Sequence, residues 1–318
     1  MTKTAFVFPG QASQYVGMGR NFYEKYAVAK EVFDQADQAL GFSISKLCFE
    51  GPDTELQLTA NTQPAILTVS VAAYRVLASL GIKPDYLAGH SLGEYSALVA
   101  AEVLDLATAV QLVHKRGLYM QTAVPAGVGA MAAVIGADFQ VVEEVCKQVA
   151  GLEVCSAANL NTPTQTVIAG EKQAVERAIA ELKSRKAGRA KLLPVSAPFH
   201  CQLMKPAADN LAKDLAEVNF PDPKIPLVNN VDAQIIMDGK KLRDSLIRQV
   251  CAPVRWTESI KLLAESGVIR FIEVGPKNVL IGLIKNIVDN VSLANIEDDK
   301  TLQQFISTNT ITTSVSAS

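Results

Sequence analysis

The chain has 318 residues, of which 49% are hydrophobic and 19% charged, and its formal net charge at pH 7 is −2. This balance allows a large buried core and argues against a nucleic acid as partner, because nucleic-acid-binding proteins normally carry a basic surface. No apolar run approaches the roughly 20 residues that span a bilayer, so we expect no membrane partner either.

The apolar segment from Ala5 to Phe8 is too short for the core of a signal peptide and fits a first β-strand better. The five cysteines form no C-x-x-C pair and leave an odd count, which favours reduced thiols and a cytoplasmic protein. The three histidines show no metal-binding spacing such as H-E-x-x-H, so we expect no metal site.

Apolar runs of strand length alternate with helical patterns, which indicates an α/β protein with a mainly parallel central sheet. Because a strand is expected just before Ser91 and a helix just after it, this serine lies at a strand-to-helix junction. The elements expected in this part of the chain are strands over 4–8 and 86–89 and helices over 63–80 and 92–103.

In the middle of the chain the expected strands and helices follow a different order, β-α-β-β-α-β. This is the order of the ferredoxin-like unit, and we place it at 126–196, inserted into the larger domain. Its expected strands cover 129–135, 154–158, 165–169 and 191–195, and its helices cover 138–150 and the region from Val175 to Leu182.

The last third returns to longer elements and ends in a polar segment. Residues 307–318 are mostly Ser and Thr without an apolar period, so we expect a disordered tail. The expected elements are a helix over 201–218, strands over 225–230 and 268–274, and helices within 240–266. The predicted division is a large subdomain formed by 1–125 and 197–300, a small subdomain at 126–196 and a C-terminal segment at 301–318.

The stretch Gly89-His90-Ser91-Leu92-Gly93 fits the G-x-S-x-G elbow, in which a sharp turn between a strand and a helix exposes a serine. The pattern alone is weak, but the expected strand and helix supply the context that it requires. A serine hydroxyl is a poor nucleophile at neutral pH and needs a base within hydrogen-bonding reach.

His200 is the best candidate for that base. His90 adjoins Ser91, but its side chain should diverge from the serine on a tight turn, and His114 lies within a helix. His200 occupies a proline-containing loop between a strand and a helix, where active-site residues concentrate. A packed or helix-capping histidine is the other interpretation. Cys201 as a thiol nucleophile is a weaker alternative, because neighbours in sequence rarely face each other at the start of a helix.

Arg116 falls in an apolar helical stripe with Ala109, Leu112, Val113 and Met120. An arginine in such a stripe is seldom fully buried without an anionic partner. The partner is either an acidic side chain in a structural ion pair or the carboxylate of a substrate, held by the planar guanidinium.

Five cations occur within residues 183–191 with no acid among them. They form either a solvated helix end, which the helix dipole favours, or a docking surface for phosphates or an acidic protein. The cations are Lys183, Arg185, Lys186, Arg189 and Lys191.

Several motifs occur together along the chain: Phe8 to Gln14, Gly89 to Leu98, Lys115 to Gly117, Asn159 with Pro163, Gln165 and Val167 to Gly170, Ser196 to His200, Gln249 with Pro253 to Trp256, and Glu273 to Pro276. In this order and spacing they resemble the malonyl-CoA:acyl-carrier-protein transacylases, and the resemblance runs from about residue 4 to 296. Together these ordered motifs are far more specific than the serine elbow alone.

The resemblance implies a hydrolase-like α/β domain that carries a ferredoxin-like insertion. It implies that Ser91 takes the malonyl group from coenzyme A as an ester, and that His200 activates the serine and later deprotonates the carrier thiol. The backbone carbonyl of Gln249 would orient the histidine, and the backbone N–H groups of Gln11 and Leu92 would form the oxyanion hole.

The same resemblance assigns Arg116 to the substrate carboxylate, which a malonyl group has and an acetyl group lacks. Phe199 resembles the malonyl-selecting form of its loop, and His90 and Asn159 would line the substrate pocket. The expected partners are malonyl-CoA and acyl carrier protein, the expected state is a monomer, and we expect no cofactor.

Three other functions stay open. A free-standing acyltransferase of a polyketide synthase would use the same residues with a different carrier protein. A serine hydrolase would use the same elbow, together with an acidic third partner and a water channel. A non-enzymatic interaction module would not need Ser91, His200 and Arg116 together.

Overall fold

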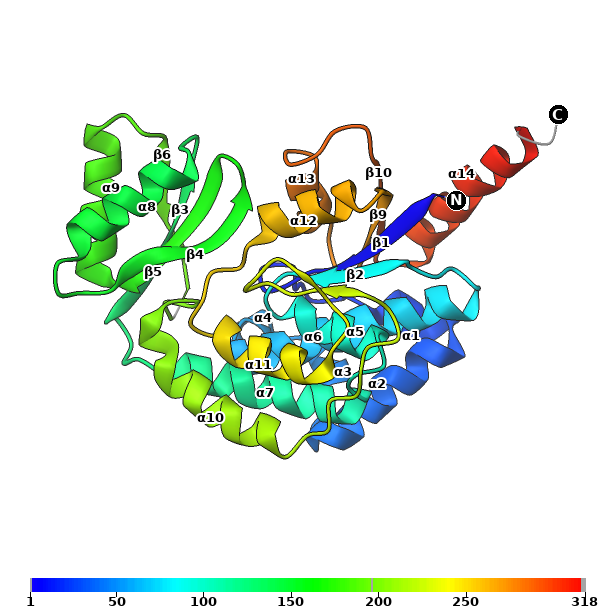
Figure 1. The fold of residues 1–318 in the computed structure, drawn as a ribbon. Helices are drawn as coiled ribbons and strands as arrows, with labels where there is room; N and C mark the ends of the chain where they lie inside the picture. Colours follow the sequence, from blue (N-terminus) through cyan, green and yellow to red (C-terminus); the bar gives the residue numbers. More distant parts are fainter. Residues whose placement is uncertain (1, 196, 316–318) are drawn as a thin grey trace.

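The computed structural model describes residues 2–195 and 197–315, and it contains two β-sheets. Figure 1 shows a layered body around the six-stranded sheet A, with the four-stranded sheet B and its helices at one end. The start of β1 and the last helix, α14, lie at the opposite end. The α/β class predicted from the sequence is confirmed.

Sheet A has the strand order β10-β9-β1-β2-β7-β8, and all its neighbouring pairs are parallel except β7 with β8. The predicted, mainly parallel central sheet is therefore confirmed. Its strands are β1 (Lys3–Phe8), β2 (Tyr86–Gly89), β7 (Leu227–Val228), β8 (Ile235–Ile236), β9 (Val268–Val274) and β10 (Ser292–Ile296).

Strand β1 is buried on both faces, as an inner strand of a parallel sheet should be. Phe6 and Phe8 belong to the larger hydrophobic core, whereas Ala5 and Val7 belong to a second core on the other face. Phe8 pairs with Gly89 at the carboxyl ends of β1 and β2. The loops that follow these two strands therefore start side by side, and both carry predicted site residues.

Helices cover both faces of sheet A (Figure 1). On the larger side lie α2 (Ala27–Leu40), α5 (Thr59–Ser79), α6 (Gly93–Ala100), α7 (Leu106–Thr122), α10 (Lys205–Ala216) and α11 (Gly239–Gln249). The other side carries α12 (Trp256–Glu265) and α13 (Val279–Ile284). Short helices complete the body: α1 (Arg20–Lys25), α3 (Ile44–Glu50), α4 (Asp53–Leu56) and the 3₁₀ helix η1 (Gln202–Met204).

Helix α5 begins four residues before its predicted start and includes Pro64. Proline has no N–H, so the carbonyl of Ala60, one turn earlier, loses its helical donor. His114 on α7 contacts that carbonyl instead, with Nδ1 at 2.8 Å from the Ala60 oxygen. This contact gives His114 a structural role and explains how the helix accommodates a proline near its start.

Sheet B has the antiparallel order β4-β5-β3-β6, which is the strand arrangement of the ferredoxin-like unit. Its strands are β3 (Gly129–Ile135), β4 (Cys155–Thr162), β5 (Gln165–Glu171) and β6 (Arg189–Leu192), and its helices are α8 (Phe139–Ala150) and α9 (Lys172–Ser184). Strand β4 extends four residues beyond its predicted end, because its second half also pairs with a segment that precedes α12.

Three hydrogen bonds attach β4 to that segment and to the first turn of α12. The Leu160 N–H donates to the Val254 carbonyl oxygen, and the Val254 N–H donates to that of Ala158, both at 2.9 Å. The Thr257 hydroxyl donates to the Leu160 carbonyl oxygen at 2.9 Å. The exact division into subdomains at 126–196 stays a prediction.

The C-terminal segment differs from the expected disordered tail. Helix α14 covers Asp299–Val315, and residues 316–318 lie outside the described part of the chain. Its first turn is anchored by the buried Leu302 and by the Asp298 side chain, which accepts the Thr301 N–H at 2.8 Å. Once a first turn is fixed, each further residue adds a hydrogen bond at lower entropic cost.

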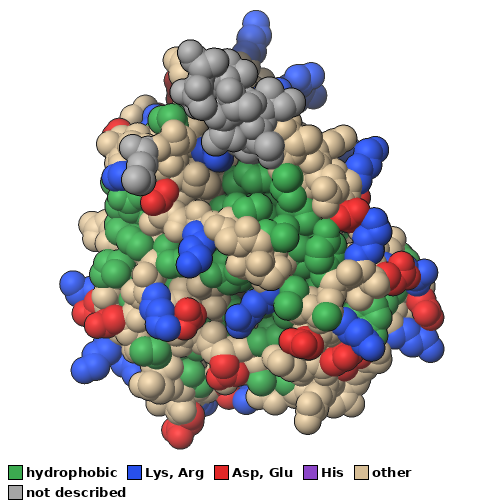
Figure 2. All heavy atoms as spheres, turned by 90° about the vertical axis from the view of Figure 1, so that its right-hand side faces the viewer, with side chains coloured by type: hydrophobic (Ala, Val, Ile, Leu, Met, Phe, Trp, Pro, Cys, Tyr) green, Lys and Arg blue, Asp and Glu red, His purple; other side chains and the backbone are tan. Residues whose placement is uncertain are grey.

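Figure 2 shows the face of the molecule that lies at this end. Hydrophobic side chains gather in its middle, and basic and acidic side chains are intermixed around them. Neither positive nor negative charge therefore dominates this face. Within residues 2–195 and 197–315, no helix combines the length and apolar character needed to cross a bilayer.

Glu273, at the end of β9, is a fully buried carboxylate whose oxygens accept the N–H groups of Leu280 at 3.0 Å and Ile281 at 2.9 Å. Burial raises its pKa from 4.5 to about 8. Between these values the native state binds more protons than the unfolded state. The contribution of Glu273 to the free energy of unfolding should therefore fall as pH rises, by up to about 1.4 kcal/mol per pH unit. Urea unfolding of the wild type and of Glu273→Gln from pH 5 to 8 isolates this contribution to the slope. Glu273→Gln should flatten it, and an equal slope in the variant would contradict the assignment.

Candidate active site

The turn after β2 holds Ser91 in an uncommon backbone conformation. Its φ angle is 52°, which residues other than glycine seldom adopt, and α6 begins two residues later. Asn230 fixes the turn from the side. Its Oδ1 accepts the Ser91 N–H and its Nδ2 donates to the Gly89 carbonyl oxygen, both at 2.7 Å. The strand-to-helix context predicted for this serine is confirmed, and the turn has the geometry of a nucleophile elbow.

Gly93 allows α6 to pack directly against β1. A Cβ at this position would lie 2.0 Å from the Phe8 carbonyl oxygen, so the backbone would have to move. We expect Gly93→Ala to lower the free energy of unfolding by about 3 kcal/mol or more, and to lower activity with it. Gly282→Ala in α13 is the matched control, since a Cβ there has no neighbour within 4 Å. The control should be stabilised by about 0.5–1 kcal/mol. Denaturant unfolding compares the two variants, and equal stabilities would refute this account.

Ser91 and His200 form a hydrogen-bonded pair. The serine Oγ lies 2.7 Å from Nε2 of the histidine, and Nδ1 lies 2.8 Å from the Gln249 backbone carbonyl oxygen. A carbonyl oxygen only accepts hydrogen bonds, so Nδ1 carries the proton and Nε2 presents its lone pair to the serine hydroxyl. The structure thus brings together the predicted nucleophile, the predicted base and the residue expected to orient it.

The environment of His200 keeps its ring neutral. The side chain is 4% exposed, and its pKa is lowered from 6.5 to about 3, first by burial and then by the positive charge of Arg116. Burial disfavours the charged imidazolium, and a nearby guanidinium disfavours it further. The histidine is therefore in the form that can accept a proton from Ser91.

Arg116, on α7, is buried beside the serine, with 1% of its surface exposed. Its Nη1 donates to Gln63 Oε1 at 2.7 Å, and its Nη2 donates to Gln249 Oε1 at 2.9 Å and to Ser91 Oγ at 3.2 Å. The Tyr95 ring lies against the guanidinium, with its centroid 5.5 Å from Cζ. Among the described residues, Arg116 forms no direct ion pair with an acidic side chain, which was one of its two alternatives.

The Nε donor of Arg116 has no hydrogen-bond partner among the described residues, although it is buried. Its other contacts are neutral amide and hydroxyl oxygens. A buried guanidinium with a spare donor and only neutral acceptors can still bind an anion, and its planar fork matches a carboxylate. The arrangement is therefore suited to an acyl group that carries a carboxylate close to its reacting carbon.

The residues predicted to form the oxyanion hole lie on the two adjacent loops. Leu92 is the N-cap residue of α6, so its backbone lies at the positive end of the helix dipole. Gln11 follows β1, and its Oε1 accepts a hydrogen bond from Gln63 Nε2 at 3.2 Å. Lys277 also holds this loop, because its Nζ donates to the Ala12 carbonyl oxygen at 3.1 Å.

The other predicted pocket residues lie around this centre. His90 turns away from the serine, as expected, and its Nε2 lies 2.9 Å from Oδ1 of Asn161. Phe199 is buried next to His200 in the larger core. Asn159 pairs with Val254 across the junction between the two sheets. In the described part of the chain, no hydrogen bond joins its side chain to the Ser91–His200 pair or to Arg116.

The thiol alternative is excluded by the surroundings of Cys201. Its side chain is 1% exposed and donates to the Pro198 carbonyl oxygen. Burial raises the pKa of the thiol to about 12, whereas reactive cysteines have lowered values. Among the described residues, no group of three or more His, Cys, Asp and Glu side chains could hold a metal ion.

Part of the basic run is engaged in surface ion pairs. Arg185 contacts Glu181 with its Nε at 2.7 Å and Glu144 with its Nη1 at 2.9 Å. Exposed pairs of this kind contribute little to stability. The ion pairs of Arg185 agree with the solvated helix end expected for this part of the run. Arg189 and Lys191 lie on the edge strand β6 instead.

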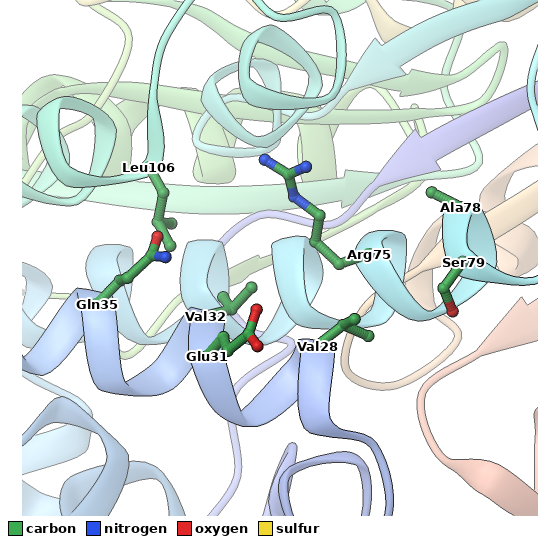
Figure 3. A pocket seen from close by; sticks show the side chains of 8 residues that line it. All are labelled: Val28, Glu31, Val32, Gln35, Arg75, Ala78, Ser79 and Leu106. Atoms are coloured by element: carbon green, nitrogen blue, oxygen red, sulfur yellow. The ribbon is translucent and has the colours of Figure 1, made fainter.

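A surface pocket of about 370 Å³ lies between α2 and α5, and Figure 3 shows its lining. Its polar lining residues are Arg75, Glu31, Gln35 and Ser79, and its apolar ones are Val28, Val32, Ala78 and Leu106. None of the residues around Ser91 contributes to it. The pocket is therefore separate from the candidate active site.

Four buried polar residues of the site were missed by sequence reasoning: Gln63, Glu94, Asn161 and Asn230. Gln63 and Glu94 are polar residues within apolar helical patterns, and this is the signal that singled out Arg116. Applied to every buried helix face, the same test would have found both. Asn161 and Asn230 carry no comparable sequence signal.

A serine and a neutral histidine at an elbow, with a cationic group beside them, form a site suited to acyl transfer or hydrolysis through a serine. The chain belongs to the acyl transferase family, because the acyl transferase domain model matches residues 5–310. The family resemblance noted in the sequence is thereby confirmed.

Relatives of known sequence or structure agree with this assignment. The malonyl CoA-acyl carrier protein transacylase of Escherichia coli K12 is 51% identical over 299 residues, which cover 94% of this chain and 97% of that protein. The same-named protein of Bacillus subtilis 168 is 45% identical, covering 97% and 98%. The solved transacylase of Coxiella burnetii has a TM-score of 0.94 at 44% identity, covering 96% of this chain and 97% of the other.

One further solved structure contains a carrier protein. It is described as a type II polyketide-synthase acyl carrier protein in complex with its malonyl-transacylase. The matched chain has a TM-score of 0.92 at 47% identity, and the match covers 95% of this chain and 98% of the other.

Proposed function

We propose that the protein transfers a malonyl group from malonyl-CoA to the phosphopantetheine thiol of an acyl carrier protein through an ester on Ser91. The observation that carries the proposal is the pairing of Ser91 with neutral His200, while buried Arg116 donates to the same serine oxygen. The relatives that match nearly the whole chain bear the name of this activity.

In the first half of the reaction, Ser91 Oγ attacks the thioester carbonyl carbon while its proton passes to His200 Nε2. Backbone N–H groups of Gln11 and Leu92 stabilise the oxyanion that forms. The carbon–sulfur bond then breaks, and the coenzyme A thiolate leaves with the proton from the histidine. A malonyl-serine ester remains on the enzyme.

The second half runs the same steps in reverse order with a new thiol. His200 takes the proton of the carrier thiol, and the sulfur attacks the serine ester. The ester bond breaks, and Ser91 recovers its proton from the histidine. Donor and acceptor carry the same pantetheine arm, so one site serves both in a ping-pong cycle. No cofactor takes part.

Arg116 selects the acyl group in this proposal. The carboxylate of a malonyl group would bind its planar fork, whereas an acetyl group leaves the buried cation without a partner. The backbone partner of His200 argues against the hydrolase alternative, since the expected third member was an acidic side chain and Nδ1 faces a carbonyl oxygen instead. Phe199, His90 and Asn159 complete the proposed pocket.

The proposed setting is a cytoplasmic monomer that supplies extender units for fatty acid synthesis. A polyketide carrier is the second candidate acceptor, favoured by the solved complex of a 47% identical transacylase with such a carrier protein. Parallel transfer assays with purified fatty-acid and polyketide carrier proteins distinguish the two settings, because kcat/KM should be higher for the carrier protein that the enzyme serves.

Mass spectrometry of the intact protein tests the reaction. After brief exposure to malonyl-CoA the mass should rise by one malonyl group on Ser91, and this adduct should persist until a carrier thiol is added. Ser91→Ala should gain nothing. An adduct that disappears in buffer alone would point to a hydrolase, and the absence of any adduct would overturn the proposal.

A further inference from the structure

Glu94 is a buried carboxylate beside the nucleophile that the proposed reaction does not use. It lies in the first turn of α6 with no exposed surface. Its Oε2 accepts hydrogen bonds from Gln249 Nε2 at 2.8 Å and from the Asn230 N–H at 3.0 Å. Both partners belong to the site, because Gln249 contacts His200 and Asn230 holds Ser91.

The side-chain amide of Gln249 can be placed in two orientations, and its surroundings favour one. Its Nε2 faces three acceptors: Glu94 Oε2 at 2.8 Å, the Ser91 carbonyl oxygen at 3.1 Å and Asn230 Oδ1 at 3.3 Å. Its Oε1 accepts from Arg116 Nη2 at 2.9 Å. In the reverse orientation, the amide oxygen would face the carboxylate and the NH₂ group would face the guanidinium. Donors would then meet donors and acceptors would meet acceptors.

We propose that Glu94 is a positioning residue for acyl-group selection. Its carboxylate fixes the orientation of the Gln249 amide, and the amide oxygen in turn holds the Arg116 guanidinium beside Ser91. This inference rests on the proposed function in one respect, namely that Arg116 binds the malonyl carboxylate.

The arrangement also places an acidic side chain close to Arg116 without direct contact. Burial raises the pKa of Glu94 to about 7, while the hydrogen bonds from Gln249 and Asn230 and the charge of Arg116 oppose that rise. One amide separates the Glu94 carboxylate from the guanidinium. A carboxylate bound directly to the fork would occupy the donors that the substrate carboxylate needs. The buried cation thus has an acidic group nearby and still has donors for a ligand.

Two substitutions of Glu94 test the proposal in loading assays with malonyl-CoA and acetyl-CoA. Glu94→Leu removes the acceptor, whereas Glu94→Gln keeps an oxygen that can accept both hydrogen bonds. The leucine variant should lower the malonyl-to-acetyl ratio of kcat/KM about tenfold, the effect of losing one hydrogen bond to a charged group. Most of this loss should appear in the KM for malonyl-CoA. The glutamine variant should restore the ratio to within about threefold of the wild type.

A matched control separates positioning from general destabilisation. Glu273 is also fully buried and also accepts two N–H groups, but these belong to α13. Glu273→Leu should leave the acyl-group ratio unchanged even where it lowers the melting temperature. A ratio that falls equally in both variants would assign Glu94 to the structure alone.

A double-mutant cycle tests the route through Gln249. Gln249→Leu removes the amide and keeps the backbone carbonyl that contacts His200. In this background Glu94→Leu should cause no further loss of the ratio, because the amide that it positions is gone. Additive losses would overturn the proposal. If Glu94→Leu does not fold, Glu94→Asp takes its place in the cycle, since it withdraws the carboxylate by one methylene group.

The remaining outcomes separate this inference from the proposed function. If Arg116→Ala keeps the wild-type ratio, the role of the arginine fails and this inference fails with it. If Arg116→Ala loses the ratio and Glu94→Leu keeps it, only the role of Glu94 is overturned.

Discussion

Arg116→Ala should lower the ratio of malonyl to acetyl loading by roughly a hundred- to a thousandfold. The guanidinium is buried 3.2 Å from the Ser91 oxygen, and only the malonyl group offers it a carboxylate. Breaking a buried charge pair by removing one partner costs about 3–5 kcal/mol, and each 1.4 kcal/mol corresponds to about a factor of ten. Competition between the two thioesters, read by intact mass, measures the ratio directly.

Two further variants sharpen this result. Arg116→Lys keeps the charge but loses the planar fork, so it should recover only part of the ratio. Arg177→Ala removes an exposed arginine on α9 that contacts the Val149 carbonyl oxygen, and it should leave the ratio unchanged. A wild-type ratio in Arg116→Ala would show that another group selects the acyl chain.

His200→Ala should lower kcat for malonyl transfer by roughly 10²–10⁴-fold, the range that a positioned general base contributes. The histidine lone pair lies 2.7 Å from the serine oxygen, and the Gln249 carbonyl fixes the ring from its other side. Steady-state transfer to a carrier thiol measures kcat. Loading alone, followed by mass, shows whether the ester still forms slowly.

His114→Ala is the control for this loss, because that histidine contacts the Ala60 carbonyl and no site residue. Its kcat should stay within about twofold of the wild type for the folded protein, even where loss of the Ala60 contact lowers the free energy of unfolding. The pH profile adds a second check. The lowered pKa of His200, about 3, places the acid limb of kcat/KM well below 6.5. An acid limb near 6.5 would contradict a buried, neutral histidine.

The sequence predicted the pairing of Ser91 with His200 because local patterns mark both partners. The elbow needs a strand, a tight turn and a helix, and each has its own sequence pattern around Ser91. His200 was the histidine left in a loop at the edge of the sheet. Arg116 was found because a charge interrupted an apolar helical face. In all three cases the residue type and its position in the local pattern together pointed to a functional role.

Two of the supporting residues, Asn161 and Asn230, could not be predicted because their contacts depend on long-range packing. Asn230 follows a strand of only two residues, β7, and reaches Ser91 across 139 positions of sequence. Asn161 contacts His90 only because β4 extends beyond its predicted end and pairs with the segment before α12. Neither residue interrupts a periodic pattern, so nothing in its neighbourhood marks it.

The position of Arg116 has an effect on the strength of the base. Its charge is the second cause, after burial, of the lowered pKa of His200. A malonyl carboxylate bound to the guanidinium as proposed would cancel that charge, and the imidazole would become more basic once the substrate is in place. An acetyl group brings no charge and leaves the histidine a weak base. On the proposed mechanism the preferred substrate would strengthen the catalytic base, so discrimination would appear in kcat as well as in KM.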